Sequence, residues 1–419
     1  MSRTLETSAE ILKLGRLVGV PEGELDYLDG VPPEELRALR EQVTDSLFDT
    51  GAATLARLGA AAKLLPSGLV ASISERAFGP LLCARAAASV DPAKAIDVAQ
   101  RLSPGFLADA TIELDPRRVA RIIAGVPTDL VEPVAAELGR REEHVTMGRF
   151  LAFVSDDAIV AAMGALSDEA MLRTAFVLEH KEALDHAVGL LPPERLPSVL
   201  HCASENDLWP EALDLLDHLS AETRGPIADV VAQLDEDLVA RLVAAVSEAG
   251  IWESLLPVVS TMTPEGRLLI ASRPAFHDDR VLAEIVHAAA VSGQWLDLVP
   301  LLRALPAEVV AKLPAVVTDL DHDTLARMLT QAVAAADTLV PLLDIVSDMD
   351  DVGRAKVIEV VDAADRSSGE LLVAALTDPE HVRLLLDHVP ADVLAAVERS
   401  ADRVGLRAEY DAAVADAGR

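Results

Sequence analysis

The sequence predicts an all-α protein, a right-handed α-solenoid of short stacked helices. Hydrophobic residues make up 51% of the chain and aromatic residues only 3%, so the apolar bulk is Ala, Val and Leu. Ala and Leu favour helices, and the apolar residues recur at helical spacing. In addition, one pattern of residues returns at a fixed interval of 43 positions. A fixed interval of about 20–50 residues is typical of proteins whose repeated units stack on their neighbours.

The three tryptophans mark this interval, because Trp209, Trp252 and Trp295 are each 43 residues apart. Other positions keep the same spacing in sets of three: Leu213, Leu256 and Val299; Asp235, Asp278 and Asp321; Val239, Leu282 and Leu325. We expect each tryptophan to fill the same gap between helices in its own repeat. The alternative is a ladder of exposed tryptophans that binds a peptide.

Helix-start and helix-stop signals divide each repeat into three short helices. In the first repeat an acidic residue, Asp235, precedes an apolar run that ends at Gly250. An aspartate before such a run accepts hydrogen bonds from the first amides of a helix, and a glycine after it favours a helix end. Three short helices in 43 residues resemble an armadillo or HEAT repeat.

The amino-terminal part has looser units, in which Val90-Asp91-Pro92 is echoed by Leu114-Asp115-Pro116. The stretch from Leu114 to Pro127 and the stretch from Leu190 to Leu196 share a rhythm of Leu and Pro. Over about residues 90–200 this rhythm resembles the superhelical amino-terminal domain of MgtE-type magnesium transporters. The resemblance implies short stacked helices. The CBS domains and membrane channel of that family are not visible in this sequence, so only the architecture is carried over, not a transport or magnesium-gating role.

These patterns predict five segments along the chain. They are an N-terminal helical cap (1–50), an apolar helical segment (51–90), irregular short-helix repeats (91–207), a solenoid of 43-residue repeats (208–400) and a C-terminal cap or tail (401–419).

Charge and composition exclude several classes of function. The chain has 36 basic and 69 acidic residues, a net charge of −33, so it repels nucleic acid. The sequence has no stretch of about 18 uncharged apolar residues, so it predicts no transmembrane helix. Two distant cysteines, Cys83 and Cys202, and the lack of a signal sequence predict a cytoplasmic protein. The scarcity of lysine relative to arginine indicates a bacterial source.

The sequence carries no motif of a hydrolase nucleophile, a phosphate-binding loop, a dinucleotide site or a zinc protease. We therefore expect a protein that is not an enzyme and has no cofactor. A weak calcium alternative is Asp348, Asp350 and Glu359, at loop positions 1, 3 and 12 of an EF-hand. Val352 cannot ligate through its side chain and Lys356 would repel the ion, so a helix cap is the preferred interpretation.

Residues 51–90 differ from the rest of the chain, because their net charge is +3 and their apolar density is high. They form either a buried end of the solenoid or a surface for an apolar ligand. In the second case the ligand contacts would include Leu65, Leu69, Phe78 and Leu82.

Two functions remain open. The first is a non-enzymatic scaffold that presents a concave surface to a protein partner, since stacked helices form extended binding surfaces. The alternative is a carrier or sensor of an elongated hydrophobic small molecule held among Ala, Val and Leu side chains. The oligomeric state is left open by the sequence.

Overall fold

The computed structural model describes residues 2–21, 23–49, 52–216, 218–332, 336–363 and 379–417. These ranges are helical with short connections and contain no strand, which confirms the all-α prediction. The chain forms two compact units, residues 1–223 (unit 1) and 224–419 (unit 2). Among the described residues, no helix combines the length and the apolar character needed to cross a membrane.

The helices of unit 1 are short, apart from the first few. They are α1 (Ser2–Val18), η1 (Asp26–Leu28), α2 (Pro33–Asp49), α3 (Ala52–Leu64), α4 (Ser67–Ile73), η2 (Ser74–Phe78), α5 (Gly79–Ala87), α6 (Pro92–Ala99), α7 (Pro104–Glu113), α8 (Pro116–Ile123), α9 (Thr128–Arg140), α10 (His144–Phe150), η3 (Leu151–Phe153), α11 (Asp156–Ala165), α12 (Asp168–Phe176), α13 (Glu182–Gly189), η4 (Pro193–Arg195), α14 (Leu196–Glu205) and α15 (Trp209–Leu216).

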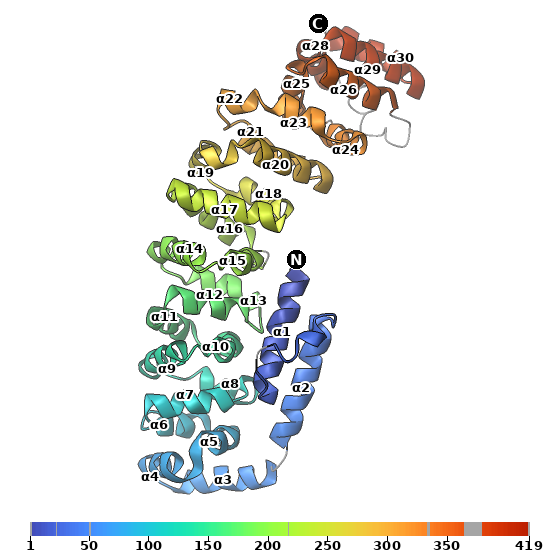
Figure 1. Ribbon diagram of the computed structural model, residues 1–419. Helices are drawn as coiled ribbons and strands as arrows, with labels where there is room; N and C mark the ends of the chain where they lie inside the picture. Colours follow the sequence, from blue (N-terminus) through green and yellow to red (C-terminus); the bar gives the residue numbers. More distant parts are fainter. Residues whose placement is uncertain are drawn as a thin grey trace. The chain divides into compact units, whose positions relative to one another are not determined.

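Unit 1 has two parts, a stack of helices and a helical pair beside it (Figure 1). From α3 onward, most helices pack against the helix two places further along the chain, as in α5 with α7, α7 with α9 and α9 with α11. The pair α1 and α2, which we call the hairpin (residues 2–49), has a small core of its own. Ile11, Leu14 and Leu36 form this core, and Leu25, Leu28 and Val31 pack against it.

Unit 2 is also made of successive helices. They are α16 (Ala221–Gln233), whose first turn contains the boundary, α17 (Glu236–Ala249), α18 (Trp252–Thr261), α19 (Pro264–Ala271), η5 (Pro274–Phe276), α20 (Asp279–Ser292), α21 (Trp295–Leu302), α22 (Ala307–Val310), α23 (Leu313–Asp319), α24 (His322–Ala332), α25 (Ala336–Ser347), α26 (Asp351–Ala363), α28 (Pro379–His388), α29 (Ala391–Val404) and α30 (Arg407–Ala417).

The helix-start and helix-stop signals act where the sequence predicts them. The Asp235 carboxylate accepts a hydrogen bond from the Leu238 amide at 2.9 Å, and Asp278 caps α20 in the same way. Gly250 ends α17 with a φ of 66°, in the left-handed region that favours glycine. These contacts stabilise the helix ends locally, which explains why they could be predicted from short sequence patterns.

The tryptophans at the 43-residue interval are buried at the first position of α15, α18 and α21. The Trp252 ring is 8% exposed, its Nε1 donates to Glu284 Oε2 at 3.1 Å, and it meets Phe276 edge-on with 6.1 Å between ring centroids. Trp295 is fully buried. The packing interpretation of these residues is therefore confirmed, and the exposed ladder is wrong.

Replacing Trp252 with alanine tests how much this packing contributes. Trp252→Ala should lower the free energy of unfolding by about 3–5 kcal/mol, because it leaves a cavity where a large ring was buried. Trp252→Phe keeps an aromatic ring and should lower it less. Urea unfolding followed by far-UV circular dichroism measures both. Tyr27→Ala is the control, since Tyr27 is 77% exposed. A loss below about 1 kcal/mol for Trp252→Ala would contradict the packing role.

Candidate functional site

The hairpin docks on the stack of unit 1 through charged side chains, and this junction is the candidate site. Residues of α1 and α2 contact residues more than a hundred positions away, around α10 and just after α12. Figure 1 shows α1 beside this part of the stack. The junction therefore joins the hairpin, in which α1 packs against α2, to the stack, whose helices pack against one another.

A buried carboxylate, Glu10 of α1, organises the hairpin side of the junction. Its side chain is 1% exposed. Lys13 Nζ lies 2.8 Å from its Oε1, Arg37 Nε lies 3.3 Å from the same oxygen, and Arg40 Nε lies 3.2 Å from Oε2. A buried carboxylate without partners would destabilise the fold by several kcal/mol. Three cations from α1 and α2 offset that penalty.

Arg40 continues from the hairpin to the stack. Its Nη1 donates to Glu179 Oε1 at 2.6 Å, across 139 positions of the sequence. Arg149 Nε of α10 lies 3.5 Å from the same Glu179 oxygen, and Lys13 Nζ lies 3.5 Å from the carbonyl oxygen of Leu178. The network that satisfies Glu10 therefore also attaches the hairpin.

Ion pairs at the edges of the junction support this attachment. Arg16 of α1 pairs with Glu143, just before α10. At the other end of the hairpin, Asp45 Oδ1 accepts from Arg117 at 3.3 Å and from Arg118 at 3.2 Å. These side chains are more exposed than the Glu10 network, so each pair contributes at most about 1 kcal/mol.

The network is unbalanced in charge. Two carboxylates, Glu10 and Glu179, face four cations, of which Lys13 and Arg40 are buried. Burial would raise the pKa of Glu10, but the attraction of Lys13, Arg40 and Arg37 lowers it below its usual value. Burial lowers the pKa of Lys13 and of Arg149. The lowered pKa of Glu10 reflects the cations around it, whereas those of Lys13 and Arg149 reflect their burial.

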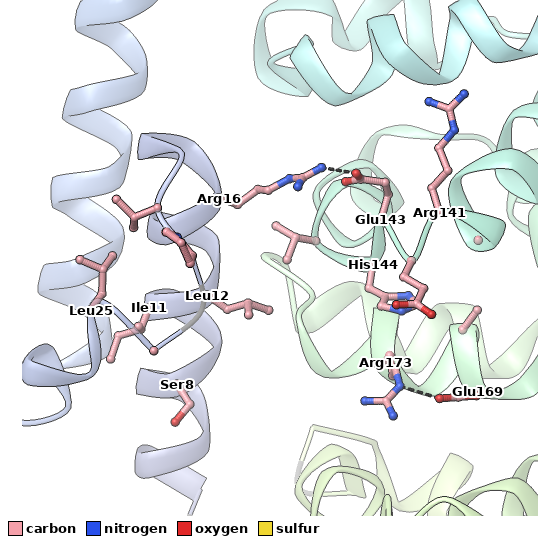
Figure 2. Close-up of a pocket in the computed structure, with 18 of the residues that line it drawn as sticks. Ser8, Ile11, Leu12, Arg16, Leu25, Arg141, Glu143, His144, Glu169 and Arg173 are labelled. Carbon is pink, nitrogen blue, oxygen red and sulfur yellow. Dashed lines mark hydrogen bonds and ion pairs between the residues drawn. The ribbon is translucent and has the colours of Figure 1, made fainter.

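A wide cavity of about 1050 Å³ lies between the hairpin and the region around α10 and α12. Figure 2 shows Leu12 and Arg16 of α1 facing Glu143 and His144 across it. Its charged groups have mixed sign, and several of them pair with one another, as in Arg173 with Glu169 at 2.9 Å. The mixture favours neither an anion nor a cation as a ligand.

A smaller cavity of about 340 Å³ adjoins the Glu10 network, and Arg16 and Val145 line both cavities. Its charged lining differs in kind from that of the wide cavity. It consists of five cations and one acid: Lys13, Arg16, Arg40, Arg85, Arg149 and Glu113. This lining is unusual in a chain of net charge −33.

The residues proposed to contact an apolar ligand lie at the surface of α4, α5 and their connections. Leu65 is 38%, Leu69 47% and Phe78 43% exposed, and Leu82 is half-buried. None of these four lines either cavity of the junction. They are therefore not part of the core, and their role as ligand contacts stays a prediction.

The calcium alternative gathers no cage in the structure. Asp350 Oδ1 accepts a hydrogen bond from the Gly353 amide at 2.8 Å and so caps α26, while Asp348 and Glu359 are exposed. Across the described ranges, no three His, Cys, Asp or Glu side chains are placed to hold a metal ion. The cap preferred from the sequence is present at Asp350.

A comparison of the sequence with known protein families and with curated proteins finds no match.

The sequence patterns described above do not predict the junction. Its residues leave one weak signal: Glu10 and Lys13 alternate with Ile11 and Leu14 on the buried face of α1, and Arg40 follows buried Leu36 by one helical turn. Charged residues at apolar-face spacing indicate partners elsewhere in the chain.

Glu10→Gln tests the network through its pH dependence. The pKa of Glu10 is lower in the folded chain than its ordinary value of 4.5. Its stabilising contribution is therefore present above pH 4.5 and lost as the pH falls through the folded pKa. At pH 7 the variant should unfold more easily by about 3–5 kcal/mol, because it leaves buried cations without their partner.

The measurement is urea unfolding of both chains at several pH values between 7 and 3. The difference between them should shrink as the pH falls below 4.5. Glu35→Gln is the matched control, since Glu35 is an exposed glutamate of α2. A difference that stays constant over this range would show that the ionised form of Glu10 does not stabilise the junction.

Proposed function

We propose that this chain is a non-enzymatic helical-repeat scaffold that presents a concave surface to a protein partner. In this proposal the helices form a right-handed solenoid of armadillo- or HEAT-like repeats of about 43 residues. The observation that carries the proposal is the hairpin, a helical pair seated on the stack of unit 1 through polar side chains. In this proposal the hairpin occupies the surface of the stack to which a partner would bind.

The packing order supports the repeat architecture. In unit 2, α18 packs against α21, α21 against α25 and α25 against α28, so contacts run between neighbours along the chain. The buried tryptophans that open α18 and α21 occupy equivalent places, and the aspartate caps before α17 and α20 recur with them. Stacked repeats of this kind present extended surfaces for other chains.

The chemistry of the junction supports an exchangeable contact. The hairpin buries Ile11, Leu14 and Leu36 in its own core, and it contacts the stack through Arg16 and Arg40. Polar interfaces of this kind are typical of contacts that form and separate, whereas permanent interfaces are more apolar. A partner helix with cations spaced as in α1 and α2 fits the same acidic residues, Glu143 and Glu179.

A peptide added in trans tests this proposal in the full chain. Arg40→Glu should release the hairpin, because the new carboxylate would lie beside Glu10 and Glu179. A fluorescent peptide of residues 2–49 should then bind the variant saturably in anisotropy measurements. It should bind the unaltered chain at least about tenfold more weakly, because the tethered hairpin competes at high effective concentration.

The same peptide carrying Arg40→Glu is the matched control and should bind neither chain. Equal binding of the unaltered peptide to both chains, or binding to neither, would overturn the proposal that this surface receives a helical ligand.

A second candidate is a carrier or sensor of an elongated hydrophobic small molecule. It is favoured by five large apolar side chains that are exposed between residues 64 and 81: Leu64, Leu65, Leu69, Phe78 and Leu81. Exposed apolar clusters are typical of binding surfaces. Solvent extraction of the protein from its native host followed by mass spectrometry should then release a lipid-like molecule. Leu69→Asp should abolish its retention while circular dichroism stays unchanged, and extraction without any such molecule would exclude this candidate.

A further inference from the structure

The small cavity beside the Glu10 network has the form of a ligand site. Its volume of about 340 Å³ lies at the lower end of the range of about 300–1000 Å³ that is typical of small-molecule sites. Its walls come from the hairpin (α1 and α2) and from the stack (α5, the end of α7, and α10). Arg16 is 51% exposed at its edge, so solvent reaches the cavity beside this residue.

The charges that surround this cavity are not balanced within the chain. Five cations and one acid, Glu113, line it. Glu10 and Glu179 pair with Lys13, Arg40 and Arg149, and Glu143 pairs with Arg16, so positive side chains remain in excess around the cavity. In addition, Arg40 is only 6% exposed, and its Nη2 has no hydrogen-bond partner among the described residues. A buried donor without a partner destabilises the fold unless a ligand or water accepts from it.

Burial disfavours the charged forms of two of the cavity residues. Burial lowers the pKa of Lys13 despite its contact with Glu10, and burial lowers the pKa of Arg149 despite its closeness to Glu179. An added anion would oppose both effects, because it favours the charged forms of its neighbours.

We propose that this cavity binds a small molecule through a phosphate group, held by Arg40, Arg149 and Lys13. A phosphate monoester carries about −1.5 to −2 charges near pH 7, and the cations in excess around the cavity attract it. Arginine forks suit phosphate oxygens because they donate two parallel hydrogen bonds. The inference goes beyond the proposed function and does not depend on it, since the site is complete while the hairpin is docked.

The rest of the lining indicates room for an organic body next to the phosphate. Besides Thr44 and Thr146, the remaining lining is apolar: Leu17, Leu81, Ile112, Leu114 and Val145. The net charge of −33 does not prevent anion binding, because charges beyond about 8 Å are largely screened at physiological ionic strength. The charges that matter are therefore those of the cavity itself.

Calorimetric titration of the full chain tests the proposal, with inorganic phosphate and glycerol 3-phosphate as probes at pH 7. We expect one saturable site. Arg149→Gln should weaken binding at least about tenfold, because a hydrogen bond to a charged group is worth about 1.5–3 kcal/mol. Arg101→Gln is the matched control, since Arg101 is an exposed arginine paired with Asp97 outside the cavity, and it should leave binding within about twofold of the unaltered chain.

The two probes separate the sources of the phosphate. Tighter binding of glycerol 3-phosphate assigns an organic phosphate that uses the apolar walls, and equal binding assigns free phosphate; both outcomes support the site. The absence of a saturable site for either probe would overturn it, as would equal weakening by Arg149→Gln and Arg101→Gln.

A second variant keeps the test decisive if Arg149→Gln does not fold. Leu81→Trp changes no charge and enlarges a partly exposed cavity residue of α5. The larger side chain should occupy the cavity and weaken binding of both probes at least about tenfold, because a filled site does not accommodate further atoms without strain. Unchanged affinity in a folded Leu81→Trp chain would overturn the proposal. The peptide experiment above uses neither variant, so the two proposals can fail separately.

Discussion

The position of the hairpin depends on the burial of one carboxylate. Glu10 lies on the face of α1 that carries Ile11 and Leu14, where an apolar residue would be ordinary. Its charge is tolerated there because Lys13 and Arg40 bond both of its oxygens. Since Arg40 also bonds Glu179 of the stack, the geometry that satisfies Glu10 also fixes where the hairpin docks. Removing Glu10 would take from buried Lys13 its carboxylate partner and from Arg40 one of two.

The local charge at the junction is opposite in sign to the net charge of the chain. Acidic residues outnumber basic ones almost two to one over the whole sequence, yet cations exceed acids in the Glu10 network and around the small cavity. Screening limits the influence of distant acids to about 8 Å, so the local sign decides which ligands the junction attracts. This local reversal is a stronger indication of a site than the large negative net charge of the chain.

Local sequence patterns could predict the helices but not the junction. Asp235 accepts a hydrogen bond from an amide three positions away, and the left-handed backbone of Gly250 is a property of that single residue. Both signals therefore depend on only a few neighbouring residues. The same holds for the cap at Asp350. The bond between Arg40 and Glu179 spans 139 positions and depends on how the hairpin returns to the stack. No spacing rule encodes that return, and only the charged residues on the buried face of α1 hint at it.

The two proposals are coupled by the residues that they share. A phosphate held by Lys13 and Arg40 of the hairpin together with Arg149 of the stack would favour the docked hairpin, because all three donors converge only in that state. A partner that displaces the hairpin separates these donors. Because binding free energies are reciprocal, the partner must then weaken phosphate binding by the same factor by which phosphate weakens the partner. Since Lys13, Arg40 and Arg149 take part in docking the hairpin, a small anion bound to them would influence such an exchange.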